Sequence, residues 1–168
     1  MPNEPQSFYM TCVDRFHDTL NELCGFSRIA GMPDLYPFGT KAVAELLSSP
    51  EIEQKYANDR EQYMFVLVSM CVQTGVAHAS LYRKEAAHFE KNVQLLNKNN
   101  LPFIYSMALA SEMGTDGEQG AEMCSRIFSD WQTLVPKVWN PQTHAEDLFD
   151  SFMACYQLGL SWYIVKTL

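Results

Sequence analysis

The sequence has few basic side chains and none of the short motifs that identify a chemistry. It holds 12 Lys and Arg against 20 Asp and Glu, a formal net charge of −8 at pH 7. Because nucleic-acid and anionic-membrane binders depend on basic surface, this balance argues against both classes. A Gly-rich phosphate loop, a Cys-x-x-Cys pair and a His-Glu-x-x-His motif are also missing from the sequence. An enzyme is therefore unsupported, and we predict no catalytic residue, cofactor or metal ligand.

Cysteine is sparse and its pattern excludes a disulfide framework. The five cysteines are widely spaced and odd in number, whereas small secreted domains carry dense, even sets. Each lies in an apolar stretch, so we predict buried free thiols that pack as small hydrophobic groups. Residues 1–7 lack the basic and apolar pattern of a secretory signal. We therefore expect a cytoplasmic protein, with residues 1–6 forming a flexible tail.

What is present is helical periodicity along nearly the whole chain. With 168 residues, 47% of them hydrophobic, the length suits one domain spanning residues 1–168. A loop is expected at residues 26–39 because Gly and Pro cluster there, and Thr40 would cap the next helix. We predict an all-α fold, an irregular bundle of six or seven helices around one core. Helices are expected at residues 8–24, 40–47, 59–82, 86–96, 102–113, 115–134 and 143–165, with a further start signal at Ser49-Pro50-Glu51.

Two of these helices are apolar over most of their circumference. Residues 63–82 contain no charge and are long enough to span a bilayer, but internal polar residues favour a buried central helix. Residues 65–68 alone are also compatible with a buried strand. Gly75 and Ala79 lie four apart and would let another helix approach closely. In the last helix the polar positions form one narrow line: Asp147, Asp150, Ala154, Gln157 and Ser161. A chain of this size surrounds one such helix easily, so two suggest a homodimer or partner interface without requiring one.

Two features suggest ligand binding. His78 lies in the uncharged segment, where we expect it to be buried and hydrogen-bonded to Gln73, Thr74 or a backbone carbonyl. Glu85 and His88 have the Glu-x-x-His spacing that carboxylate-bridged metal bundles use twice, but only one copy is present. A solvated helix side explains that pair better. A helical small-molecule, haem or metal-binding domain using these residues is the alternative function.

The favoured function is a non-enzymatic protein-binding module, of the adaptor, inhibitor or immunity type, with an acidic and aromatic surface. Residues 1–62 and 99–168 each carry a net charge of −5, and residues 63–98 carry +2. This asymmetry is compatible with a basic protein partner, although solubility alone explains an acidic surface better. Trp131 continues an apolar helix face and is expected in the core. The predicted partner-binding residues are Asp116, Glu118, Glu122 and Asp130 for charge and Trp139 as the aromatic anchor.

Overall fold

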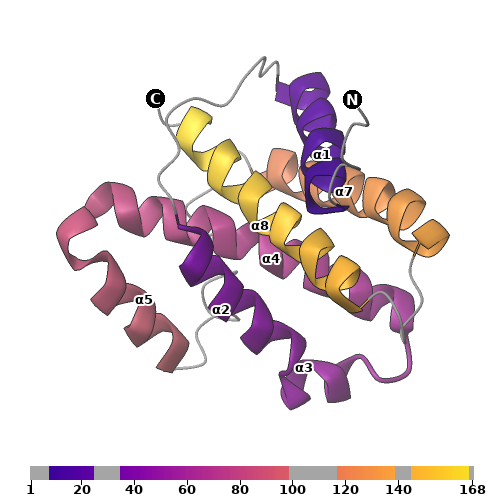
Figure 1. Ribbon diagram of the computed structural model, residues 1–168, viewed down its shortest axis with the longest axis horizontal. Helices are drawn as coiled ribbons and strands as arrows, with labels where there is room; N and C mark the ends of the chain where they lie inside the picture. Colours follow the sequence, from indigo (N-terminus) through magenta and orange to yellow (C-terminus); the bar gives the residue numbers. More distant parts are fainter. Residues whose placement is uncertain (1–7, 25–34, 99–116, 139–144, 167–168) are drawn as a thin grey trace, which may run out of the picture.

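A computed structural model describes residues 8–24, 35–98, 117–138 and 145–166 of the chain. Within these ranges the regular secondary structure is entirely helical, with seven α-helices, one 3₁₀ turn and no strand (Figure 1). The predicted all-α bundle of six or seven helices is confirmed, and residues 65–68 are helical. The elements are α1 (Phe8–Cys24), α2 (Tyr36–Leu47), α3 (Pro50–Lys55), α4 (Arg60–Lys84), η1 (Ala86–His88), α5 (Phe89–Lys98), α7 (Gly117–Val138) and α8 (Ala145–Lys166). The expected tail at 1–6, the expected helix at 102–113 and the expected helix starts at 115 and 143 lie outside the described residues.

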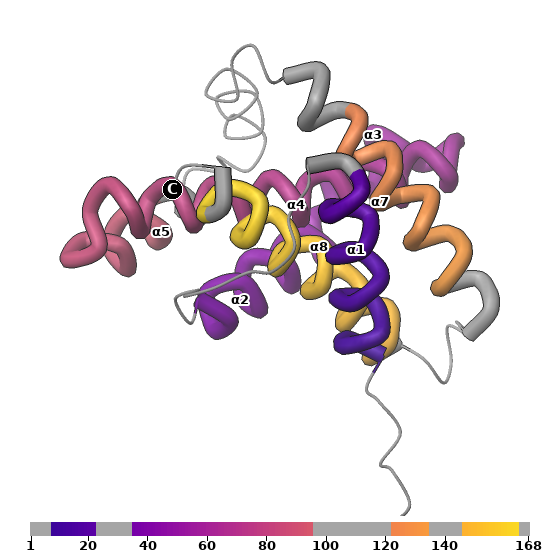
Figure 2. The backbone as a smooth tube through the Cα atoms, turned by 90° about the horizontal axis from the view of Figure 1, so that it is seen from above, coloured from indigo at the N-terminus to yellow at the C-terminus, as the bar shows by residue number. Residues whose placement is uncertain are grey.

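The centre of the bundle is the crossing of α4 and α8 (Figures 1 and 2). The two helices touch at glycines: a Cβ on Gly75 would overlap the carbonyl oxygen of Tyr156, and one on Gly159 would overlap that of Val72. The predicted close approach at Gly75 is therefore confirmed. Around this pair, α1 and α2 pack on α8, and α7 packs on α1 and α4. The two apolar helices shield each other as well as being covered by their neighbours.

Among the described helices, α4 alone meets the length and hydropathy expected of a membrane-crossing segment. In its most apolar 18-residue window, 61% of the residues are buried inside the protein. Its middle, from Leu67 to Ser80, is largely inaccessible to solvent. Helix α4 is therefore packed as the central helix of the bundle, as the sequence predicts.

Helices α3 and α4 begin where the sequence predicts, and each has a side chain that caps its N-terminus. The Ser49 side chain accepts a hydrogen bond from the backbone N–H of Ile52. Asp59 accepts one from Gln62, with 3.1 Å between Oδ1 and the amide nitrogen. Both side chains satisfy amide groups that have no partner within the first helical turn.

The expected boundary of the second helix is wrong. Helix α2 begins at Tyr36 and includes Pro37 and Gly39, which the sequence analysis placed in a loop. Proline is compatible with a first helical turn because its missing N–H has no intrahelical partner there. Thr40 does not cap the helix, since its hydroxyl donates to the carbonyl of Tyr36 at 2.9 Å. Gly39 is required by packing, because a Cβ at this position would overlap the ring of Tyr156.

The expected polar line on α8 holds only for its first turns. Asp147 and Asp150 are partly exposed, but Ala154 and Ser161 are buried. The Ser161 hydroxyl donates to the carbonyl of Gln157 at 2.8 Å, so it needs no solvent. Backbone bonding of this kind lets a serine lie in an apolar helix interface. Beyond Asp150, most of α8 is enclosed by the bundle.

The predicted burial of Trp131 and of the thiols is confirmed where the structure describes them. Trp131 is buried, stacks on Phe128 and Phe152, and donates its indole N–H to Ser151 at 2.8 Å. Four free cysteines are buried, and burial raises the pKa of each thiol, that of Cys124 to about 11. The uncharged thiols add apolar volume to the core and are poor nucleophiles. They are Cys12, Cys71, Cys124 and Cys155.

Candidate functional site: an acidic, partly apolar face

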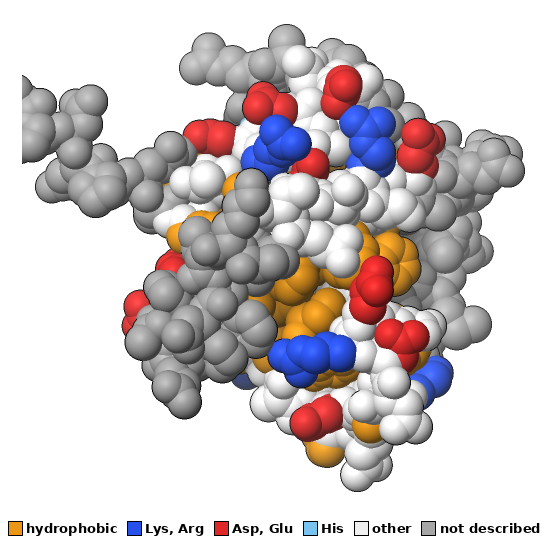
Figure 3. All heavy atoms as spheres, turned by 90° about the vertical axis from the view of Figure 1, so that its right-hand side faces the viewer, with side chains coloured by type: hydrophobic (Ala, Val, Ile, Leu, Met, Phe, Trp, Pro, Cys, Tyr) orange, Lys and Arg blue, Asp and Glu red, His pale blue; other side chains and the backbone are white. Residues whose placement is uncertain are grey.

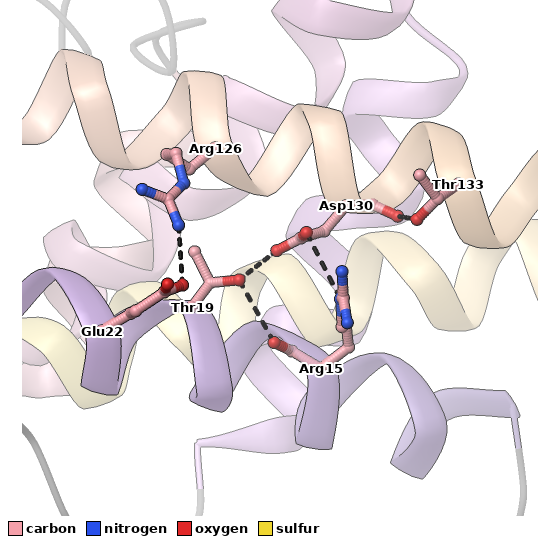
Figure 4. A network of polar contacts seen from close by, with 6 residues as sticks. All are labelled: Arg15, Thr19, Glu22, Arg126, Asp130 and Thr133. Atoms are coloured by element: carbon pink, nitrogen blue, oxygen red, sulfur yellow. Dashed lines mark hydrogen bonds and ion pairs between the residues drawn. The ribbon is translucent and has the colours of Figure 1, made fainter.

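The acidic residues predicted on α7 have different surroundings. Asp130 faces α1, where its carboxylate accepts hydrogen bonds from the Thr19 hydroxyl and from Nε of Arg15, the latter at 3.3 Å (Figure 4). Only 13% of its side chain is exposed. Glu122 lies on the same helix and is exposed. Asp116, Trp139 and the side chain of Glu118 lie outside the described residues. Partner binding by these five residues stays a prediction.

A second contact joins the same two helices. The guanidinium of Arg126 on α7 donates to Glu22 on α1 at 2.7 Å (Figure 4). Both side chains remain exposed, so solvent and salt screen this ion pair and its contribution to stability is small. The Asp130 cluster is more enclosed, and its carboxylate has two donors. We therefore assign Asp130 a structural role in holding α7 on α1.

His78 is buried, as the sequence predicts, but its partner is neither Gln73 nor Thr74. Its Nδ1 lies 2.6 Å from the hydroxyl of Tyr156 on α8, and that hydroxyl donates to the carbonyl of Leu35 at 3.3 Å. The phenol has one proton, which can go to Nδ1 or to the carbonyl of Leu35, so the tautomer of His78 sets the direction of the shorter bond. Burial lowers the pKa of His78 to about 4 and raises that of Tyr156. Both groups are therefore neutral at pH 7, and together they join α4, α8 and the start of α2.

The Glu85/His88 pair does not lie on one α-helix flank, which corrects the geometry expected from the sequence. Helix α4 ends at Lys84, and Glu85 is extended, with φ −150° and ψ 78°, before the 3₁₀ turn that contains His88. Regular helical spacing is therefore lost between the two side chains. Within the described residues, no group of three or more His, Cys, Asp or Glu side chains is arranged to hold a metal ion.

The start of α4 carries a run of partly exposed apolar side chains. Tyr63, Met64, Phe65 and Val66 are four consecutive apolar residues, and all are only partly buried. Four consecutive positions cover the whole circumference of a helix, so neighbouring helices do not cover every side here. Phe65 packs edge-on against Phe128 of α7, which anchors the segment to the core.

Other elements add apolar groups to this side of the molecule. The first turns of α4 and α8 and the end of α7 lie together on the right in Figure 1. Figure 3 shows that side face-on, with hydrophobic side chains gathered in a hollow and charged side chains along its border. The partly buried hydrophobic residues in these parts of the chain are Leu134 near the end of α7, Leu148 and Phe149 in the first turns of α8, and Tyr56 directly after α3. We call this surface the docking face.

Carboxylates outnumber cations in the segments beside the docking face, although Lys and Arg side chains also lie along it (Figure 3). Residues 51–61 supply four exposed carboxylates against the two cations Lys55 and Arg60, and the first turn of α8 adds Glu146 and Asp147. These carboxylates affect the pKa values of two neighbouring groups. The pKa of Tyr63 is raised by burial and next by Glu53, although Arg60 opposes the shift. The pKa of Asp150 is raised by burial and then by Asp147 and Glu146. A partner with positive charge would relieve this repulsion.

The sequence contains a signal for this face, but the signal does not separate the face from the core. The uncharged run beginning at Tyr63 follows directly after the acidic stretch 51–61. Its first four residues were assigned to the core with the rest of the segment. The distinction depends on where α7 and α8 stop covering α4, which periodicity within α4 does not contain.

Comparisons with known proteins find no relative. No family model, curated protein or solved structure matches this chain significantly. The function must therefore be argued from the residues and their arrangement.

Proposed function

We propose that this chain is a non-enzymatic protein-binding module, of the adaptor, inhibitor or immunity type, and that a basic partner binds at its docking face. The observation that carries the proposal is the partly exposed apolar segment Tyr63–Met64–Phe65–Val66 beside the acidic residues 51–61. Exposed apolar patches bordered by polar groups are typical of interaction sites. Aromatic and Met side chains supply large contact areas, and charged borders set orientation and partner choice.

The buried polar groups support this class over a ligand-binding or catalytic one. His78 is hydrogen-bonded to Tyr156, and both are neutral. The described cysteines are protonated, apolar in their surroundings and inaccessible. These groups are enclosed in the bundle, whereas the side chains of the docking face pack against the core and are also partly exposed to solvent.

Photo-crosslinking in the native host tests the proposal. Tyr63 is replaced by the photoreactive residue p-benzoylphenylalanine, which keeps the aromatic bulk, and the matched control carries it at Tyr36, an exposed tyrosine on α2. We expect irradiation to give a discrete protein adduct from position 63 and none from position 36. Glu51→Lys with Glu53→Lys should remove the adduct by reversing the adjacent charge. Absence of any adduct from positions 63, 64 and 65 would refute the proposal.

The predicted α7 residues are tested separately. Charge reversal at Glu118 and Glu122 should weaken the same association if the acidic surface extends along α7 to the partner. Unchanged crosslinking from position 63 in this double variant would confine the partner to the docking face.

A further inference from the structure

Among the described residues, the part of the molecule opposite the docking face carries more cations than carboxylates. Residues 63–98 carry a net charge of +2, whereas the segments on either side each carry −5. All the charged residues of this segment follow Tyr82, at the end of α4 and in η1 and α5. We call residues 82–98 the arm. It projects from the left of the molecule in Figures 1 and 2.

The arm also exposes large apolar side chains. Tyr82 is 38% exposed and Leu95 is 49% exposed, and these are two of the four most exposed large hydrophobic residues described. The main contacts of α5 among the described elements are with α4 and η1. In the arm, the side chains of Phe89 and Val93 are buried, whereas those of Lys91 and Leu95 are exposed to solvent. The arm therefore presents cations beside apolar groups, which complements the docking face in both respects.

A molecule cannot place its own arm on its own docking face. The two lie at opposite ends of α4, a helix of 25 residues, which is about 37 Å long at the standard rise per residue. Between them, α4 packs against α8 and α7. The partner that supplies this arm must be another molecule.

We propose that the docking face binds the arm of a second copy of this chain, so that the protein associates head to tail. This inference rests on the proposed function, since it identifies the partner of the same face. A head-to-tail contact leaves one face and one arm unused in a dimer. Association should therefore continue with concentration until a ring closes or a chain of molecules forms.

Sedimentation velocity of the purified chain, from about 1 to 200 μM, tests the inference by charge exchange. One variant carries Glu51→Lys and Glu53→Lys in the face, and the other carries Lys84→Glu and Lys91→Glu in the arm. We expect the wild type to associate with rising concentration, and each variant alone to bind at least about tenfold more weakly. Mixing the two variants should restore association, because the reversed face then meets a reversed arm. Asp14→Lys with Asp18→Lys on α1 makes the same net charge change as the face variant and should leave association unchanged.

The results of sedimentation and crosslinking together distinguish a failure of this inference from a failure of the proposed function. A wild type that stays monomeric over the whole range would overturn the inference. If position 63 still crosslinks to a different protein in the host, the proposed function stands and only the identity of the partner is wrong. Association that neither variant weakens, or that the mixture does not restore, would also overturn the assignment of face to arm.

Discussion

Gly75 and Gly159 lie at the point where α4 and α8 cross, each against the backbone of the other helix. The absence of a side chain at both positions lets the two central helices approach closely. This proximity brings His78 within reach of Tyr156 and places the first turns of both helices on the same side of the molecule. The geometry of the core and that of the docking face therefore depend on the same crossing.

Gly75→Ala and Gly159→Ala should each destabilise the fold strongly. In a free helix the change from Gly to Ala is favourable by about 1 kcal/mol. Here the added Cβ would overlap a backbone carbonyl, which cannot rotate away, so we expect a net loss of about 3 kcal/mol in the free energy of unfolding. Thermal denaturation should show Tm falling by roughly 6–12 °C. Ser125→Ala, at an exposed position on α7, is the control and should leave Tm nearly unchanged. A higher Tm for Gly75→Ala would contradict the close crossing.

His78 should make the fold acid-sensitive. Its pKa is lowered by burial to about 4, against 6.5 for an unperturbed imidazole. The unfolded chain therefore binds the proton more readily, and stability contributed by neutral His78 is complete above pH 6.5 and lost as the pH falls toward 4. Two and a half pKa units correspond to about 3 kcal/mol. Guanidinium unfolding of wild type and His78→Gln at pH 7.5 and pH 4.5 isolates this contribution. The variant should lose about 2–3 kcal/mol less than the wild type between the two pH values. Equal losses would show that His78 is solvated.

Tyr156→Phe should destabilise the protein without changing its shape. Removing the hydroxyl leaves Nδ1 of His78 without its buried partner, whereas the carbonyl of Leu35 still accepts from the backbone N–H groups of Phe38 and Gly39. A buried polar group left unsatisfied costs about 1–3 kcal/mol. Tyr63→Phe, on the partly exposed face, removes a hydroxyl that water can replace and should change the free energy of unfolding by less than about 0.5 kcal/mol. Equal stability of the two variants would argue against the His78–Tyr156–Leu35 chain.

Alanine variants of Asp130 and Glu122 should differ in their free energy of unfolding. Asp130→Ala removes the acceptor of both Thr19 and Arg15, and we expect a loss of about 1–2 kcal/mol in the free energy of unfolding. Glu122→Ala changes an exposed position and should stay within about 0.5 kcal/mol of the wild type. Chemical denaturation of both variants measures the difference. If Asp130→Ala is as stable as Glu122→Ala, the carboxylate is free to serve a partner as the sequence suggested.

Local signals in the sequence were sufficient for several elements. Ser49 and Asp59 begin helices because a short oxygen-bearing side chain can reach the amide groups of the first turn. The uncharged segment around His78 predicted burial, and the small residue at Gly75 predicted close packing. Each of these inferences needs only residues a few positions apart. The start of α2 was misplaced because Pro37 and Gly39 favour loops locally, whereas here they lie in a helix that packs under Tyr156.

By itself, therefore, the sequence determined that the chain is a bundle of helices with a mostly neutral interior and an acidic exterior. Only the tertiary structure decided which side chains meet. Tyr156 is 78 residues from His78, and Asp130 is 115 residues from Arg15. Such contacts depend on the rotation of each helix about its axis and on the angle at which helices cross, which local periodicity leaves open. The docking face arises in the same way, where α7 and α8 leave the first turns of α4 partly uncovered.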